Sequence, residues 1–312
     1  MSQSFSIIIP HRDCPDLLQR CLDSIPVRDN IQVIVVDDNS DSSIVDFDHF
    51  PGNDREDVTI VYTKEGKGAG YARNVGLEYA TGEWVVFADA DDYFFSQSLI
   101  RLFDMDLPKD ANVVLYQFKF HRRDGSSFVY PDIEAPEGSE AIHLIVSHNT
   151  NDLCRMAVMP WAKMVRKEHL DKYHIRFEEI KWGNDMIYST KLSLSVDSFL
   201  VAPLLVYSYE WLPNSLVNKE LGLEMFYTRA LLSLKRAKLL QQGGRLDYNI
   251  FRDQWFMRIY SMDFWHSLIL RARCVRDLGL GYCLANWKDY TRNPFYLTRL
   301  LIKRMIGQTK TV

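Results

Sequence analysis

The chain has 312 residues, of which 47% are hydrophobic and 25% are charged, with a formal net charge of −4. This composition is typical of a soluble globular protein, and the length allows one or two domains. The five cysteines are scattered without a CxxC pair, and no apolar run approaches the about 20 residues that a transmembrane helix needs. A strand that begins soon after Met1 leaves no room for a signal peptide, so we expect a cytoplasmic protein.

The charge is divided unevenly along the chain. Residues 1–130 carry 12 Lys and Arg against 22 Asp and Glu, a net charge of −10, whereas residues 241–312 carry 12 Lys and Arg against 5 Asp, a net charge of +7. The acidic part favours a cation, and the basic part favours an anionic partner such as a membrane surface. We expect no nucleic-acid partner, because no recognised binding motif accompanies the basic residues.

Short apolar runs in the first part of the chain predict strands. They are rich in β-branched residues and nearly continuous in apolar character, as in a parallel sheet that is buried on both faces. Segments with helical periodicity, Asp16–Ile25 and Gly70–Ala80, alternate with them. This alternation predicts a doubly wound α/β fold with a mainly parallel sheet. The predicted strands are Phe5–Ile9, Ile31–Val36, Val58–Tyr62 and Trp84–Ala88.

Further strands are predicted before the pattern becomes helical at about Lys219. We therefore predict two domains, residues 1–215 around the sheet and residues 216–312 as a helical, basic region. Gly243 and Gly244 mark a break between two long helical patterns. The later strands are Asn112–Phe120, a hairpin partner at Phe128–Tyr130, and Phe199–Tyr207; the helical patterns are Met186–Leu194, Glu220–Gln242, Tyr248–Arg273 and shorter pieces to about Met305.

Three acids, Asp89, Asp91 and Asp92, follow the apolar run Trp84–Phe87. Ligands bind open α/β sheets at the carboxyl ends of the strands, where these acids are expected to lie. Neighbouring carboxylates repel each other unless a cation shares the site, and oxygen ligands suit Mg²⁺ or Mn²⁺. The cluster therefore predicts a metal that holds a diphosphate. The alternative is a solvated acidic turn in which an Asp caps the next helix.

Two further segments are expected at the same sheet edge. The first two strands end in Ile9–Asp13 and Val36–Ser40, where an Asp can accept hydrogen bonds from a nucleotide base or ribose. Later glycines, in Gly66–Gly70, precede a helix that carries Arg73, and this arrangement favours an anion. Simple loop flexibility stays the alternative for these glycines. The dinucleotide fingerprint G-x-G-x-x-G is absent from the first strand–helix turn, so no nicotinamide cofactor is expected.

Four ordered motifs resemble glycosyltransferase family 2, whose members are inverting enzymes with the nucleotide-sugar-binding GT-A fold. The resemblance is strong over about residues 4–120 and weaker to about residue 190, where Pro160–Lys163 and Phe177–Met186 are similar to later family elements. It does not cover the C-terminal third. The motifs are SIIIPHRD, LLQRCLDSI, QVIVVDDNSDSS and GKGAGYARNVGLEYATGEWVVFADADD.

The resemblance implies a role for individual residues. Two departures from the family pattern stand out: His11-Arg12-Asp13 replaces the usual Thr-Tyr-Asn, which makes a uracil base less certain, and Asn184-Asp185 replaces the usual Glu-Asp. The implied nucleotide-sugar-binding residues are Pro10, His11, Arg12, Asp13, Asp38, Gly70, Arg73, Asp89 and Ala90; Asp38 accepts a hydrogen bond from uracil, Arg73 lies beside the diphosphate loop, Asp89 and Asp91 bind Mn²⁺ or Mg²⁺, and Asp185 is the general base.

Asp185 has competing interpretations. Glu178 and Glu179 are rival bases, and a helix cap is a purely structural role for Asp185, since a helical pattern follows it. Trp161 and Trp182 are candidates for stacking on a sugar ring. A core position is equally compatible with Trp161.

The basic tail also has two interpretations. Gln254–Arg276 and Phe295–Met305 interleave aromatic and aliphatic residues with arginines and lysines. Such helices lie on anionic membranes, or they pack on a protein with their basic side chains in solvent. A position on the inner face of the membrane is thus left open.

The resemblance, to which the acid cluster at the sheet edge conforms, implies an inverting glycosyltransferase. It would move a sugar from a nucleotide-diphosphate donor, a UDP-sugar, to a hydroxyl of a glycan or lipid-linked acceptor in cell-surface polysaccharide synthesis. One alternative is a sugar nucleotidyltransferase, which would require glycines in the first strand–helix turn. The other is a non-catalytic nucleotide-sugar-binding protein.

Overall fold

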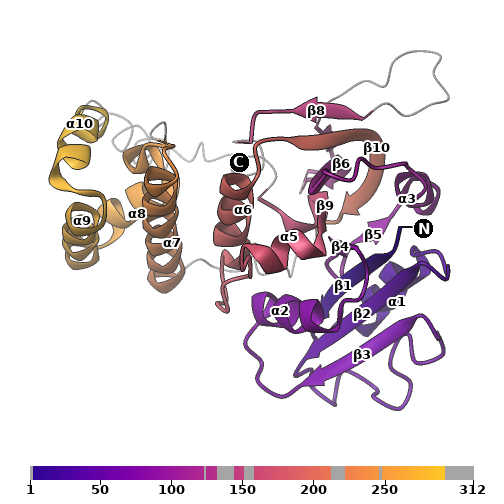
Figure 1. Cartoon of the computed structure of the whole chain (residues 1–312). Helices are drawn as coiled ribbons and strands as arrows, with labels where there is room; N and C mark the ends of the chain where they lie inside the picture. Colours follow the sequence, from indigo (N-terminus) through magenta and orange to yellow (C-terminus); the bar gives the residue numbers. More distant parts are fainter. Residues whose placement is uncertain are drawn as a thin grey trace. The chain divides into compact units, whose positions relative to one another are not determined.

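The computed structural model describes residues 3–122, 124–131, 144–150, 158–211, 222–245 and 248–291. The chain divides into two compact units, Met1–Lys219 and Glu220–Val312. The first unit is an α/β sheet flanked by helices, and the second is helical throughout its described part (Figure 1).

The sheet of the first unit has the strand order β3-β2-β1-β4-β9-β6-β10-β5, with β7 paired to β6 and β8 paired to β10. Strands β3, β2, β1 and β4 are parallel to their neighbours, as are β6 and β10, so the mainly parallel sheet is confirmed. The bounds are β1 Phe5–His11, β2 Ile31–Asp38, β3 Val58–Thr63, β4 Trp84–Phe87, β5 Tyr93–Phe94, β6 Val113–His121, β7 Ser127–Tyr130, β8 Ile145–Ser147, β9 Lys163–Arg166 and β10 Phe199–Tyr209.

The register of the central strands brings the functional segments together. Every residue of β1 and β4 is buried, because both faces of these strands are covered. In the β1–β2 pair, Ile9 lies opposite Val35 and His11 opposite Asp37. Strand β4 runs parallel on the other side of β1. The carboxyl ends of the three strands therefore meet at one edge of the sheet.

Strand β9 was not predicted from the sequence. It lies between β4 and β6 and is antiparallel to both. Its four residues are Lys-Met-Val-Arg, a sequence with neither a long apolar run nor a regular alternation that would indicate a central strand. Lys163 is nevertheless fully buried in the sheet. Only the neighbouring strands make this segment part of the sheet.

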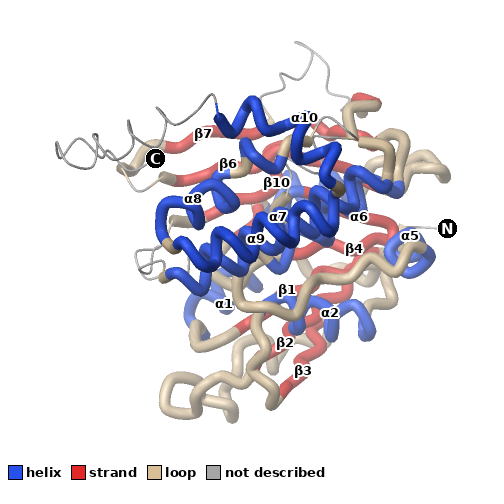
Figure 2. Tube along the Cα trace, turned by 90° about the vertical axis from the view of Figure 1, so that its left-hand side faces the viewer, coloured by secondary structure: helices blue, strands red, loops and turns tan. Residues whose placement is uncertain are grey.

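The structure describes five α-helices in the first unit, and Figure 2 shows α2 beside the strands of the sheet. Helix α2 packs on β1 and β2 and also contacts α6, whereas α3 packs on β10. Pro15 opens α1, where its missing N–H costs nothing. The bounds are α1 Pro15–Asp23, α2 Ala69–Tyr79, α3 Ser96–Phe103, α5 Lys167–Lys172 and α6 Asn184–Ser195.

The second unit corrects one predicted helix. The pattern at Tyr248–Arg273 is interrupted at two aspartates: Asp253 accepts hydrogen bonds from the backbone N–H groups of Trp255 and Phe256, and Asp263 accepts one from His266. Each Asp caps a new helix, because its carboxylate satisfies N–H groups that would otherwise lack a partner. The helices are α7 Leu223–Gln242, the 3-10 turn η2 Ile250–Arg252, α8 Gln254–Met262, α9 Phe264–Leu278 and α10 Leu280–Thr291.

Helix α7 ends at Gln242, so the break predicted at Gly243 and Gly244 is confirmed. Among the residues that the structure describes, no helix is both long and apolar enough to cross a membrane. The predicted Phe295–Met305 helix lies outside the described residues.

Candidate active site

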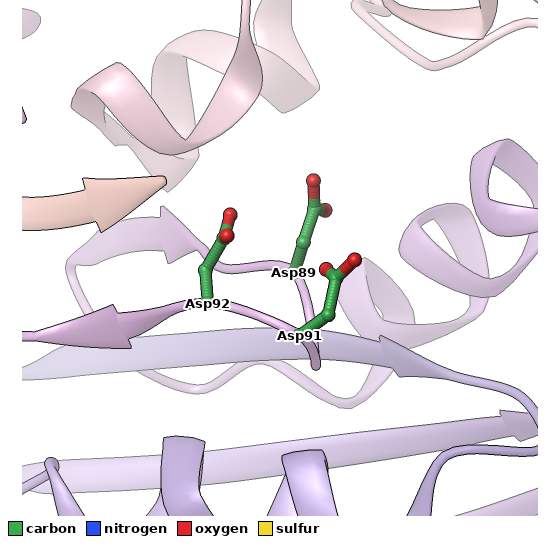
Figure 3. A group of neighbouring side chains, drawn as sticks. All are labelled: Asp89, Asp91 and Asp92. Atoms are coloured by element: carbon green, nitrogen blue, oxygen red, sulfur yellow. The ribbon is translucent and has the colours of Figure 1, made fainter. Parts of the chain in front are cut away.

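Asp89, Asp91 and Asp92 form the acid cluster of the site. Each offers a carboxylate oxygen within 4.8 Å of the others, and their side chains point to the same side of the loop that follows β4 (Figure 3). The alternative of a capping Asp is wrong, because the residue that precedes the next helix, α3, is Phe95. Three oxygen donors at one point fit a hard divalent cation such as Mg²⁺ or Mn²⁺.

The three acids are not equivalent. Asp92 is fully buried, and its two oxygens accept hydrogen bonds of 2.8 Å from the Tyr207 hydroxyl and the Glu210 backbone N–H. Asp89 and Asp91 are half-buried. Burial, followed by the charge of Asp89, raises the pKa of Asp91 to about 6. A cation between Asp89 and Asp91 would relieve this repulsion, so the donor set fits the predicted metal.

Arg73 joins the acid cluster to the helix that carries Asp185. This buried side chain forms an ion pair with Asp89 through Nη2 and donates to Asn184 Oδ1 at 3.0 Å through Nη1. Its guanidinium lies 5.3 Å from the centre of the Phe177 ring. Its Nε has no hydrogen-bond partner among the described residues. The arginine predicted beside the diphosphate thus holds two parts of the site together.

Asp185 is the second residue of α6. The residue that caps this helix is Gly183, so the interpretation of Asp185 as a cap is wrong. A carboxylate in the first turn is still stabilised by the helix dipole. Burial raises the pKa of Asp185; the charges of Arg73 and Lys163 lower it, and that of Asp89 raises it. Its neighbour Asn184 accepts a hydrogen bond from Arg73, which is paired with Asp89, so the start of α6 is linked to the acid cluster.

The rival bases have other surroundings. Glu179 is exposed, with Lys67 Nζ 4.0 Å and Asn74 Nδ2 3.4 Å from its carboxylate. Glu178 is half-buried, and its backbone N–H donates to Asn184 O at 3.1 Å. These surroundings favour Asp185 as the base, a role that stays a prediction.

The end of β1 divides into an inward and an outward part. Pro10 and His11 are buried, and His11 Nδ1 lies 2.8 Å from Asp37 Oδ2 while its Nε2 accepts from the Cys14 N–H. The imidazole therefore faces the protein. Arg12 instead has a 51% exposed side chain. Asp13, which is partly exposed, accepts from the backbone N–H of Asp41 at 2.7 Å.

Asp38 at the end of β2 is buried and anchors the glycine loop. Its oxygens accept hydrogen bonds from the Gly68 backbone N–H and from the Thr63 hydroxyl at 3.2 Å. Gly68 has φ +95°, a conformation that favours glycine. The predicted base-binding residue thus also holds the loop that leads into α2.

Gly70 has a packing role that the sequence did not indicate. A Cβ at this position would lie 2.2 Å from Glu178 O and 2.8 Å from Asn184 Cβ. Only glycine allows the start of α2 to approach the segment that carries Asp185 so closely.

Gly70→Ala is expected to lower the free energy of unfolding by about 1–3 kcal/mol, because the methyl group overpacks against a backbone carbonyl. Thermal unfolding of the purified variant measures this effect. Gly281→Ala is the control, since a Cβ there meets nothing within 4 Å. If Gly70→Ala is as stable as Gly281→Ala, α2 moves away from Glu178 without a loss of stability, and the prediction is wrong.

The roles of three further side chains were left open by the sequence or were not assigned from it. Trp161 packs in the core and stacks on Tyr207 with ring centres 4.9 Å apart, so the core interpretation holds for it. Lys163 donates to Met159 O at 2.7 Å, and burial lowers its pKa to about 7. Trp182 is half-buried beneath Lys181, whose Nζ lies 4.8 Å from its ring. No local signal marked Tyr207 or Lys163, because their neighbours come from distant segments.

A mostly parallel sheet with an acid cluster after a central strand is the GT-A fold, and solved structures of this fold resemble the chain. Residues 1–349 of S. aureus TarS in complex with UDP-GlcNAc match with a TM-score of 0.55 and 20% identity, over 77% of this chain and 71% of that one. A mannosyltransferase from Pyrobaculum calidifontis in complex with GDP-Man and Mn²⁺ matches with a TM-score of 0.53 and 16% identity, over 98% of this chain and 88% of that one.

The chain belongs to the family described as Glycosyl transferase family 2, which matches residues 6–173. It is 32% identical to a poly(ribitol-phosphate) beta-glucosyltransferase of Bacillus spizizenii over 36% of this chain, and 28% identical to glycosyltransferase GlyG of Streptococcus pneumoniae over 56% of it. These matches cover 19% and 60% of the relatives' own lengths. An uncharacterized glycosyltransferase of Escherichia coli, YibD, is 22% identical over 96% of this chain and 97% of its own.

Proposed function

We propose that the chain is an inverting glycosyltransferase that moves a sugar from a UDP-sugar to a hydroxyl of a glycan or lipid-linked acceptor in cell-surface polysaccharide synthesis. The observation that carries the proposal is that Arg73 links the acid cluster to the start of α6, since it is paired with Asp89 and donates to Asn184, the neighbour of Asp185. Family membership supports the reaction class, and relatives named for poly(ribitol phosphate) support a polymeric acceptor.

The proposed reaction needs one base and one cation site. Asp89 and Asp91 would hold Mn²⁺ or Mg²⁺, which neutralises the charge that develops on a leaving diphosphate. Asp185 accepts the proton of the acceptor hydroxyl as its oxygen attacks the anomeric carbon from the face opposite the diphosphate. Inversion follows from this single displacement, and no protein nucleophile is required.

The nucleotide is assigned to the ends of β1 and β2. Arg12 and Asp13 would line this side of the pocket, with the buried Pro10 and His11 behind them, and Asp38 would accept a hydrogen bond from the base. The exposed guanidinium of Arg12 offers a planar surface on which a base can stack. Gly70 and Ala90 lie along the diphosphate and sugar. Calorimetric comparison of UDP with GDP tests the assignment to uracil.

Two other functions would fit a nucleotide-sugar site. A sugar nucleotidyltransferase would form the donor from a nucleoside triphosphate, and the absence of glycine from Pro10–Cys14 and the family match count against it. A non-catalytic binding protein would bind the donor without turnover. The half-buried acids and the raised pKa of Asp185 favour catalysis over binding alone.

A donor screen separates these functions. Thermal unfolding is measured with UDP-sugars, GDP-sugars and nucleoside triphosphates, each with Mn²⁺ and with EDTA, since a ligand of the folded state raises its stability. The purified protein should be stabilised by a nucleotide sugar with Mn²⁺ and should slowly release the free nucleotide. Pyrophosphate release from a triphosphate and a sugar phosphate would support the nucleotidyltransferase, and stabilisation without turnover the binding protein.

We further propose that helix α9 binds an anionic membrane surface. Trp265, Leu268 and Ile269 of this helix expose apolar side chains at helical spacing, and Trp265 is 68% exposed. Arg271, Arg273 and Arg276 follow on the same helix with one acid, Asp277, which is ion-paired with Arg276, so the helix keeps a net positive charge beside its apolar residues. This combination suits an interfacial helix that contacts anionic lipid.

Full-length protein is expected to co-sediment with anionic vesicles at low salt and to dissociate at about 0.5 M salt, where the charges are screened. The double variant Trp265→Ser/Leu268→Ser should lose most of the binding, because its apolar anchors are removed. Val27→Ser is the control, since Val27 is equally exposed but lies in the first unit. Binding that survives the double variant, or no binding at low salt, would contradict the proposal.

A further inference from the structure

Tyr207 in β10 contacts the acid loop at two points. Its hydroxyl accepts a hydrogen bond from the Asp89 backbone N–H at 2.9 Å and donates one to Asp92 Oδ2 at 2.8 Å. The other oxygen of Asp92 accepts from the Glu210 N–H at 2.8 Å, and the Asp92 N–H donates to Asp89 O at 3.1 Å. The loop is thus held at its first and last acid by the end of β10.

The ring of Tyr207 is itself fixed. It is fully buried, stacks on Trp161 with ring centres 4.9 Å apart, and meets Phe94 edge-on at 5.1 Å. Because these contacts hold the ring in place, they also fix the position of the Tyr207 hydroxyl oxygen. A partly buried N–H that loses its partner costs free energy, so the loop favours the geometry in which the Asp89 N–H reaches the Tyr207 hydroxyl.

We propose that Tyr207 and Asp92 form a clamp that sets the separation of the Asp89 and Asp91 carboxylates. In this arrangement Tyr207 is a positioning residue, and Asp92 is an anchor of the loop rather than a metal ligand. The inference rests on the proposed cation site of Asp89 and Asp91.

The clamp has a consequence for cation affinity. Ligands that are held in place bind without the entropy cost of ordering the loop. Removal of the Tyr207 hydroxyl leaves Asp89 and Asp91 unchanged but frees the loop. Changes to groups that orient metal ligands commonly cost about 10- to 100-fold in affinity.

The test is a titration of the full-length protein with Mn²⁺ in the presence of saturating UDP. The concentration of free Mn²⁺ is measured at each step by electron paramagnetic resonance. Tyr207→Phe keeps the ring and is expected to raise the Kd for Mn²⁺ about 10- to 100-fold. Transfer or donor hydrolysis should recover at high Mn²⁺, so that the apparent KM for the metal changes more than kcat.

Tyr282→Phe is the matched control. The Tyr282 hydroxyl also accepts from a backbone N–H, that of Ile250 at 3.2 Å, and donates to an oxygen, that of Tyr248 at 2.8 Å, but it lies in the helical unit. Its loss should leave the Mn²⁺ affinity unchanged. Asp92→Asn is a second variant of the clamp and should weaken Mn²⁺ binding as well, even if Tyr207→Phe does not fold.

The outcomes separate the two proposals. Wild-type affinity in Tyr207→Phe, or an equal change in Tyr282→Phe, would overturn the clamp while the cation site stands. Asp92→Asn with wild-type affinity would also overturn it. If the wild-type protein binds UDP without any contribution from Mn²⁺, the cation site itself is wrong, and the clamp falls with it.

Discussion

Asp185→Asn is expected to lower sugar transfer by about 100-fold or more, the usual cost of removing a general base. Asparagine keeps the size of the side chain and its place in the first turn of α6, but it cannot accept the proton of the acceptor hydroxyl. Donor affinity should be unchanged. Initial rates with a UDP-sugar and calorimetric binding of UDP measure the two quantities.

Glu178→Gln and Glu179→Gln are the matched controls. Both acids belong to the same segment as Asp185; Glu179 is exposed, and Glu178 is half-buried. They should retain most of the transfer rate. Near-normal turnover in Asp185→Asn, together with a large loss in one of the controls, would assign the base to that glutamate.

The pH dependence of transfer follows from the same group. Burial raises the pKa of Asp185 above the ordinary value of 3.8, and only the deprotonated form accepts a proton. The rate should therefore fall as the pH decreases through this raised pKa. A pH profile of kcat/KM in Asp185→Asn should lack this acidic limb; its persistence would assign the limb to another group.

The second large effect concerns the cation site: UDP binding is expected to weaken strongly in EDTA and in Asp91→Asn. Three carboxylates within 4.8 Å repel a diphosphate when no cation is present. Calorimetry with Mn²⁺, with EDTA and with the variant measures the loss. Asp110→Asn is a control, since Asp110 is exposed and is not a member of the cluster. Equal UDP affinity with and without metal would remove the cation from the proposal.

Asp91→Asn should also make the metal-free protein more stable above about pH 6. Burial and then the charge of Asp89 raise the pKa of Asp91 to about 6, so the folded state binds this proton more tightly than the unfolded state does. Stability from this group is therefore present below the ordinary pKa of 3.8 and is lost as the pH rises through about 6. Thermal unfolding in EDTA at pH 4 and pH 8 should show a much larger stabilisation of the variant at the higher pH.

The sequence by itself determined the sheet core and the place of the acids. The buried runs of β1, β2 and β4 are nearly continuous in apolar residues, and such runs are typical of parallel strands covered on both faces. Since parallel strands present their carboxyl ends at one edge, the positions of Asp38, Asp89 and Asp91 followed from local pattern alone. Asp253 and Asp263 interrupt the predicted Tyr248–Arg273 helix, and Asp is a residue type that often caps helices. The helical periodicity of the segment nevertheless favoured one continuous helix.

Only the tertiary structure decided how these parts meet. Strand β9 is central because β4 and β6 pair with it, not because Lys163–Arg166 favours a strand. Gly70 must be glycine because a carbonyl more than 100 positions away, that of Glu178, approaches it. Likewise the Tyr207 hydroxyl reaches Asp89 and Asp92 across a comparable separation. Contacts between distant segments depend on the exact course of the backbone, and no local periodicity encodes that course.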